Sequence, residues 1–146
     1  MTVVPFKMTD YPKARLVNGV GLEHRELVMG VVSTLRYMEK SGTFYTLWDG
    51  ETVVLIAGWH KAWAGVCEVS FFPTEAFVKS PYTGVKELKK KLTELAKTHW
   101  RIQITCRNEM VFTNFATHLG FTREGVLRKY GHDKADYIMM SIVEGL

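Results

Sequence analysis

Residues 119–128 read LGFTREGVLR, and this stretch joins an apolar helical segment to an apolar strand-like one. Gly120 is suited to end a helix because glycine adopts the left-handed conformation without strain. Phe121 then returns the chain to the core. We expect Glu124 to pair with the two arginines of this stretch along the solvated side of a hairpin. The stretch therefore predicts a helix that stops abruptly and a strand that follows at once.

The segments on either side of this junction show clear periodicity. A short helix is predicted over Asn108–Leu119, with the asparagine as its N-cap. Two final strands are predicted over Phe121–Tyr130 and Ala135–Val143, joined by a turn that contains Gly131. Before the helix, Arg101–Arg107 alternates apolar residues with polar ones, which indicates a strand with one buried face.

The first half of the chain predicts a strand, a helix capped by Thr9 or Asp10, a second helix and a three-stranded meander. Apolar residues at spacings of three and four predict an amphipathic helix over Leu22–Met38, ended by Ser41-Gly42. An Asp-Gly pair at 49–50 predicts a hairpin turn. The predicted strands are Thr2–Lys7, Thr43–Trp48, Thr52–His60 and Val66–Phe72, with a break near Ala64-Gly65 before the last.

A crossover is predicted in the middle of the chain. Pro73–Tyr82 carries turn residues without periodicity and is expected to be a loop. Gly84 then opens a helix that ends near Thr98, with leucines on one face and lysines on the other. If this helix is a crossover, the strand at Arg101–Arg107 runs parallel to the one at Val66–Phe72.

Composition points to one folded domain over residues 1–146. The chain has 146 residues, of which 47% are hydrophobic and 23% charged, so it is too apolar to be disordered. Its formal net charge is +4, and much of the excess lies on the predicted helix 84–98. The lysines there lack interleaved aromatic residues, which argues against a nucleic-acid partner. The positive net charge is also consistent with an anionic small molecule as ligand.

The sequence lacks the patterns of a membrane span, a secretion signal and a metal site, and these absences guide our expectations on location and metal binding. No apolar run has the roughly 20 residues that cross a membrane, and residues 1–10 do not resemble a secretion signal, so we expect an intracellular, cytoplasmic protein without membrane contact. Cys67 and Cys106 lie in apolar strands, with no Cys or His nearby at a metal-ligand spacing. We expect buried free thiols and no metal site.

The order of the predicted elements resembles that of the GNAT (GCN5-related N-acetyltransferase) superfamily. Residues 119–128 are similar to the L-G-F-x-x-E-G-x-L-R signature of acetyltransferases that modify ribosomal-protein N-termini, and Asp136-Tyr137 with the methionine-rich run that follows matches the family's final strand. The resemblance implies an α/β (α+β) fold. Its sheet would be mixed and mostly antiparallel, with a central splayed parallel pair and helices on both faces.

The resemblance implies an acyl-coenzyme A-dependent N-acyltransferase that moves an acetyl group from acetyl-CoA to an amine of a small molecule or protein. In this family the pyrophosphate binds at the N-terminus of the crossover helix, where free amides and the helix dipole favour anions. Residues 79–86 keep one glycine of the family's usual two, and the lysines there supply positive charge. The residues expected at the cofactor are Phe71, Phe72, Lys79, Tyr82, Thr83, Gly84, Val85, Lys86 and Asn108.

Three residues are candidates for acid–base chemistry. Glu68 lies on the strand where some members of the superfamily place a carboxylate base, although a surface position on a half-exposed strand explains it equally. His60, at a strand end between tryptophans, is a second candidate base or a structural residue. The family's tyrosine acid falls at Ala116, which leaves Tyr130 as a candidate donor or as a packing residue.

A second resemblance leads to a different function. The runs Val-Cys-Glu-Val at 66–69 and Tyr-Gly-x-Asp at 130–133 are similar to small GNAT-like proteins of T7-like phages. Some of those are described as acetyltransferases and others as internal virion proteins. On this hypothesis the chain is a non-catalytic virion or protein-binding component with protein partners, found in the host cytoplasm or the virion. The reduced phosphate loop and the missing tyrosine favour it, and the sequence leaves the oligomeric state open.

Overall fold

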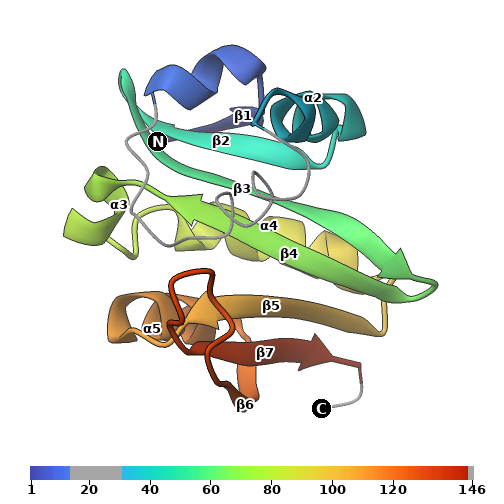
Figure 1. The fold of residues 1–146 in the computed structure, drawn as a ribbon. Coiled ribbons are helices and arrows are strands. Elements are labelled where there is room, and N and C mark those ends of the chain that lie inside the picture. Colours follow the sequence, from blue (N-terminus) through green and yellow to red (C-terminus); the bar gives the residue numbers. More distant parts are fainter. Residues whose placement is uncertain (14–30, 145–146) are drawn as a thin grey trace. The chain divides into compact units, whose positions relative to one another are not determined.

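The secondary structure follows the predicted order with one short addition. A computed structural model describes residues 1–13 and 31–144 (Figure 1). The addition is a short helix, α3, whereas the 3-10 helix η1 contains Thr9 and Asp10, where the sequence predicts the start of a helix. The elements are β1 (Thr2–Pro5), η1 (Met8–Lys13), α2 (Val31–Ser41), β2 (Phe44–Asp49), β3 (Thr52–Trp63), β4 (Val66–Pro73), α3 (Glu75–Lys79), α4 (Val85–Ala96), β5 (Arg101–Arg107), α5 (Met110–Leu119), β6 (Thr122–Leu127) and β7 (Tyr137–Val143).

The strands form a mixed sheet in the order β1-β2-β3-β4-β5-β7-β6. β4 and β5 pair in parallel, while β1–β2, β2–β3, β5–β7 and β6–β7 pair antiparallel. The predicted parallel pair is confirmed, and α4 is the helix of the crossover that a parallel pair requires. The predicted meander and its turn after Asp49 are confirmed as well, since Asp49 pairs with Thr52.

The chain divides into two compact units. The first comprises Met1–Trp59 and Ser70–Thr83, and the second His60–Val69 and Gly84–Leu146. β3 and β4 each contribute residues to both. The prediction of a single domain over residues 1–146 stays a prediction.

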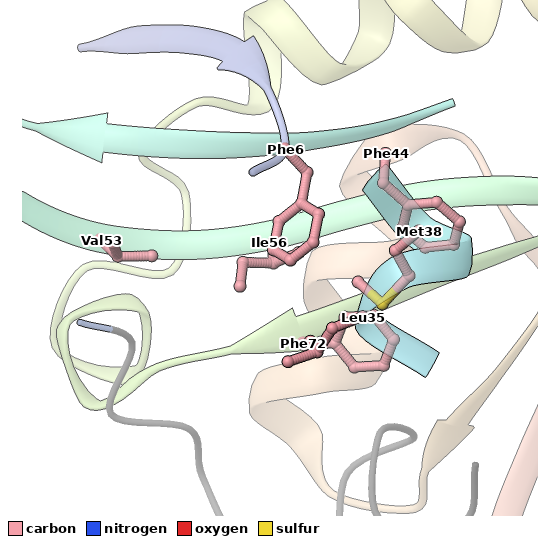
Figure 2. Close-up of a cluster of buried hydrophobic side chains, with 7 residues drawn as sticks. All are labelled: Phe6, Leu35, Met38, Phe44, Val53, Ile56 and Phe72. Atoms are coloured by element: carbon pink, nitrogen blue, oxygen red, sulfur yellow. The ribbon is translucent and has the colours of Figure 1, made fainter. Parts of the chain in front are cut away.

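The core of the first unit is aromatic and aliphatic. Phe44 and Phe72 have ring centroids 6.5 Å apart and an interplanar angle of 16°. On β3 the four residues from Val53 to Ile56 are all buried, which is typical of a strand covered on both faces. Figure 2 shows the buried cluster, which comprises Phe6, Leu35, Met38, Phe44, Val53, Ile56 and Phe72.

The predicted loop over Pro73–Tyr82 is wrong in part, because it contains α3. Thr74 is the N-cap of this helix, and its side chain accepts a hydrogen bond from the Phe77 amide. The Thr74 hydroxyl also lies 2.7 Å from the Val54 carbonyl oxygen, to which it donates. A helix of 5 residues is too short to show periodicity, so only the capping threonine signals it.

In the second unit, β5 has one buried face and one half-open face. Ile102, Ile104 and Cys106 are buried, and the residues between them are half-buried. α4 and α5 contact β5 and each other, and they bury mainly leucine and phenylalanine side chains. This alternation confirms the strand that the sequence predicts over Arg101–Arg107.

The predicted C-terminal end of α5 is confirmed, whereas its predicted N-terminal end is wrong by one residue. Gly120 ends the helix with φ of 107°, as expected for a left-handed C-cap. The N-cap is Glu109 and not Asn108. The Asn108 amide instead donates to the Asp136 carbonyl at 2.9 Å, which ties this residue to the segment before β7 and delays the helix by one residue.

The last two strands are shorter than predicted, because the connection between β6 and β7 is longer than a simple turn. Lys129 and Lys134 both have positive φ, at 53° and 65°, a conformation that ends an extended strand. The predicted helix over Leu22–Met38 falls partly on residues outside the described ranges. Within them, α2 ends at Ser41 as expected.

Both cysteines are buried free thiols, as predicted. Burial raises the pKa of Cys67 to about 11, with a smaller contribution from the charge of Glu68, and raises that of Cys106 to about 12. Burial therefore favours the protonated thiol over the thiolate at neutral pH for both cysteines. Within residues 1–13 and 31–144, no helix has the length and apolar character needed to cross a membrane.

Candidate active site

The parallel pairing of β4 and β5 places Glu68 directly opposite Gln103. Both side chains lie on the half-open face of the sheet in the second unit. The Gln103 side-chain nitrogen Nε2 donates to Glu68 Oε2 at 2.6 Å. Glu68 is half-buried. A carboxylate in this setting has a fixed orientation, which the sequence alone does not reveal.

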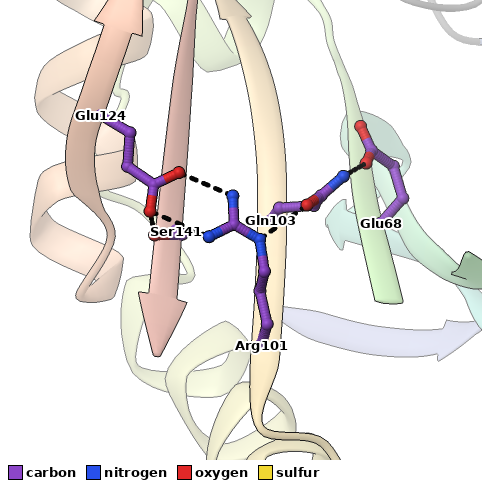
Figure 3. Close-up of polar contacts among 5 residues, drawn as sticks. All are labelled: Glu68, Arg101, Gln103, Glu124 and Ser141. Atoms are coloured by element: carbon purple, nitrogen blue, oxygen red, sulfur yellow. Dashed lines mark hydrogen bonds and ion pairs between the residues drawn. The ribbon is translucent and has the colours of Figure 1, made fainter. Parts of the chain in front are cut away.

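Arg101, two residues before Gln103 on the same face of β5, continues the chain of contacts. Its Nε donates to Gln103 Oε1 at 2.8 Å. Its two terminal nitrogens donate to the carboxylate of Glu124 on β6 at 2.9 and 2.6 Å, a bidentate ion pair. The Ser141 hydroxyl on β7 donates to the same carboxylate at 2.7 Å. We call these residues the polar array (Figure 3): Glu68, Gln103, Arg101, Glu124 and Ser141.

Glu124 has a different partner from the one predicted, since it pairs with Arg101 and not with Arg123 or Arg128. The reason lies in the strand pairing. The register between β6 and β7 shifts between Arg123 and Gly125, so Glu124 is the extra residue of a bulge. A bulge redirects its side chain, and here the carboxylate lies against Arg101 and Ser141.

The ion pair fixes the charges of its two members. Hydrogen bonds from Arg101 and then from Ser141 lower the pKa of Glu124 from 4.5 to about 2. The hydrogen bond to Glu124 is in turn the largest cause that raises the pKa of Arg101. Both side chains therefore stay charged throughout the physiological pH range.

The other two acid–base candidates lie elsewhere in the second unit. His60 is half-buried on β3. Tyr130 follows β6, has 51% of its surface exposed, and its ring centroid lies 5.2 Å from that of Tyr137. Ala116, at the family's tyrosine position, is fully buried in α5. The polar array thus contains Glu68 and neither His60 nor Tyr130, and the catalytic roles of all three remain predictions.

The N-terminus of α4 has the features expected of an anion site. Gly84 is its N-cap and adopts φ of 87°, which only glycine takes readily. The first bond within the helix runs from the Leu88 amide to the Gly84 carbonyl, so the amides before Leu88 have no partner within the helix. Lys86 is exposed in the first turn, and Glu87 beside it partly offsets that charge. Gly84, Val85 and Lys86 remain predicted cofactor contacts.

The remaining predicted cofactor residues differ in exposure. In the first unit, Lys79 ends α3 and is exposed, as is Tyr82, while the Thr83 amide donates to the Ser80 carbonyl at 3.2 Å. The side chains of Phe71 and Phe72 are buried. In the second unit the Asn108 side chain is exposed.

Sequence reasoning found Glu68 but missed Gln103, Arg101 and Ser141 as its surroundings. The signal was present in the alternation on β5, where polar residues occupy every second position of a strand that belongs to the parallel pair. In the part of the chain that the structure describes, no cluster of three or more His, Cys, Asp or Glu residues is arranged to hold a metal ion. The polar array combines carboxylate, amide and guanidinium groups, which bind charged groups through ion pairs and hydrogen bonds, and its carboxylates can also accept a proton.

Of the comparisons with known proteins, only that with solved structures finds similar proteins, and it identifies the fold of this chain. No protein-family model matches the sequence, and no curated protein sequence matches it either. Among solved structures, the chain is similar to Ard1 from Thermoplasma volcanium, with a TM-score of 0.70, 15% identity, and 97% of this chain and 96% of that one covered. It is also similar to a ribosomal-protein-alanine N-acetyltransferase from Brucella melitensis, with a TM-score of 0.67, 15% identity and coverage of 98% and 99%.

A third similar structure is yncA, a putative acetyltransferase from Salmonella typhimurium with its cofactor acetyl-CoA. The TM-score is 0.69, the identity 13%, and the coverage 97% of this chain and 92% of that one. At such identities structural similarity establishes the fold and not the activity. The chain has the GNAT fold: a mostly antiparallel mixed sheet with one parallel pair, β4–β5, and accompanying helices.

Proposed function

We propose that this protein is an acyl-coenzyme A-dependent N-acyltransferase that transfers an acetyl group from acetyl-CoA to an amine of a small molecule or a protein. The observation that carries the proposal is the Glu68 carboxylate, which Gln103 holds on the half-open face of the parallel β4–β5 pair. Support also comes from the GNAT fold, because the similar structures described above include a ribosomal-protein-alanine N-acetyltransferase and a putative acetyltransferase with its cofactor acetyl-CoA. These comparisons give no support to the alternative of a non-catalytic phage component.

Glu68 is the proposed general base. Amines are protonated at neutral pH, and an ammonium group must lose a proton before its nitrogen can attack a carbonyl carbon. An ionised carboxylate binds the ammonium and accepts that proton. The amine nitrogen then forms the new amide bond while the carbon–sulfur bond of the donor breaks, and the departing thiolate takes up a proton. When bound, acetyl-CoA would supply the activated thioester for this exchange.

The residues at the start of α4 fit a pyrophosphate. Gly84 brings backbone close to the ligand without a side chain, and the amides of the first turn provide donors. Lys86 adds a positive charge, which Glu87 reduces but does not remove. We assign Gly84, Val85 and Lys86 to phosphate binding in the second unit. Asn108 and the five candidates of the first unit stay secondary candidates.

Tyr130 is the proposed proton donor to the leaving thiolate, because Ala116 leaves no hydroxyl at the family's position. Its side chain is half exposed on the connection between β6 and β7, and it is the tyrosine closest in sequence to the signature stretch. His60 is the second candidate for proton transfer.

Calorimetric titration with acetyl-CoA, followed by an acceptor screen over small amines and peptide N-termini, tests the proposal. We expect micromolar binding and acetylation of at least one acceptor. Glu68→Gln should lower kcat/KM by about 10²- to 10⁴-fold, the usual contribution of a general base, and leave acetyl-CoA affinity unchanged. Glu94→Gln, the same substitution on the exposed face of α4, serves as control. Absence of binding at millimolar acetyl-CoA would overturn the proposal.

A further inference from the structure

Gln103 lies between a carboxylate and a guanidinium, and it contacts both through its side-chain amide. We propose that Gln103, locked by Arg101 and Glu124, is a positioning residue that holds Glu68 correctly oriented for a cationic amine acceptor. This inference rests on the proposed function, since it assigns the acceptor class and the supporting residues of the same site.

The orientation of the Gln103 amide follows from the chemistry of its neighbours. Arginine has only donors, so the group that lies 2.8 Å from Arg101 Nε must be the oxygen Oε1. The nitrogen Nε2 must then face Glu68, whose carboxylate accepts its hydrogen bond at 2.6 Å. A flipped amide would place two donors together at one end and two acceptors at the other. The contact on one side thus fixes the contact on the other.

Arg101 is itself held in place by side chains of the last two strands, β6 and β7. Its bidentate pair with Glu124 leaves the guanidinium little rotational freedom, and Ser141 orients the carboxylate from β7. The bulge at Glu124 places the carboxylate of this residue within hydrogen-bonding distance of the Arg101 guanidinium. The glutamate of the fold-defining stretch 119–128 is therefore connected to the proposed base through two intervening side chains.

The neutral amide also keeps the base available. If Arg101 contacted Glu68 directly, the ion pair would occupy the carboxylate and weaken it as a base. With Gln103 in between, Arg101 is paired with Glu124, and the array carries two negative charges and one positive charge. Arg101 and Glu68 still attract each other through this amide, since the charge of Glu68 contributes to the raised pKa of Arg101. A site with this net negative charge favours an acceptor that arrives as an ammonium cation.

Carbon-13 NMR titration of the glutamate side-chain carboxyls tests whether the array acts on Glu68, whose signal is assigned with Glu68→Gln. Gln103→Met keeps the side-chain volume and removes the amide, and Gln103→Asn shortens it in case the first variant does not fold. Loss of a donor to the charged form should raise the pKa of Glu68. The charged or titratable groups that face or adjoin it are Arg101, Glu124 and Cys67, and the neighbouring strand β3 carries His60 and Lys61. We expect the largest shift at Glu68. Thr105→Val, on the same face of β5, is the control.

The NMR titration of Glu68 tests the positioning role of Gln103, and the acetyl-CoA binding and transfer assays test the proposed function, so the two proposals can fail separately. An unchanged Glu68 titration in folded Gln103 variants overturns the inference, whatever the activity. If acetyl transfer occurs, the acidic limb of the kcat/KM profile should move up with the NMR midpoint while acetyl-CoA affinity stays constant, and a limb that does not move also overturns the positioning role. If the wild type binds no acetyl-CoA, the proposed function and the acceptor assignment fail together. A shifted titration then supports only the structural coupling of Gln103 to Glu68.

Discussion

β3 and β5 are both central strands, yet they bury their residues in different ways. In the first unit β3 has a continuous buried run from Val53 to Ile56, with packed side chains on both faces. In the second unit β5 alternates, with isoleucines and a cysteine on one face and Arg101 and Gln103 on the other. The buried run of β3 offers only apolar side chains, whereas the half-open face of β5 supplies polar side chains from a rigid backbone. The contrast locates the candidate site.

Phe72→Ala should have the largest effect on stability, because it leaves a cavity in the buried cluster of the first unit. Phe72 is 1% exposed and stacks on Phe44. We expect the free energy of unfolding to fall by about 3–5 kcal/mol, the usual loss for such a truncation in a core. Urea denaturation followed by circular dichroism measures it. Val78→Ala, on the exposed side of α3, is the matched control. A loss below about 1 kcal/mol would contradict the assigned core.

Much of the fold could be predicted from the sequence, since it depends on local chemistry. The alternation over Arg101–Arg107 gave a strand with the right boundaries, and Gly120 marked the end of a helix for a conformational reason. The parallel pairing with β4 followed from the crossover. In each case residues close in sequence carry enough information.

The predictions from sequence are wrong where contacts with residues distant in sequence determine the local structure. Asn108 is a good N-cap by type, but its amide bonds to the Asp136 carbonyl, and the helix starts after Glu109. Glu124 was assigned to arginines nearby in sequence, whereas a bulge turns it toward Arg101. The candidate site was therefore found through Glu68 alone, because the contacts that hold Glu68 come from a strand 35 residues further on.

Glu124→Gln should have an intermediate effect that depends on pH. The folded-state pKa of Glu124 is lowered from 4.5 to about 2, so its stabilising contribution is present above pH 4.5 and is lost as the pH falls toward 2. Its side chain is 38% exposed, and solvent screening limits the loss at pH 7 to about 1 kcal/mol. Urea unfolding of both proteins from pH 7 to pH 2 measures the difference. A difference that persists undiminished at pH 2 would contradict the assigned charge.

Glu94→Gln should have the smallest effect, and it shows whether the polar array adds anything to a simple ion pair. Glu94 and Lys97 form a contact of 3.0 Å on α4, but their side chains are 73% and 64% exposed, against 38% for Glu124 and 25% for Arg101. We expect a loss of at most about 0.5 kcal/mol, because an exposed pair gains little in water. Because the substitution is identical, the difference from Glu124→Gln isolates the contribution of the bidentate geometry and of Ser141. Equal losses in the same urea experiment would mean that Glu124 gains nothing from the array. In that case Arg101 would not be held firmly enough to fix the amide of Gln103.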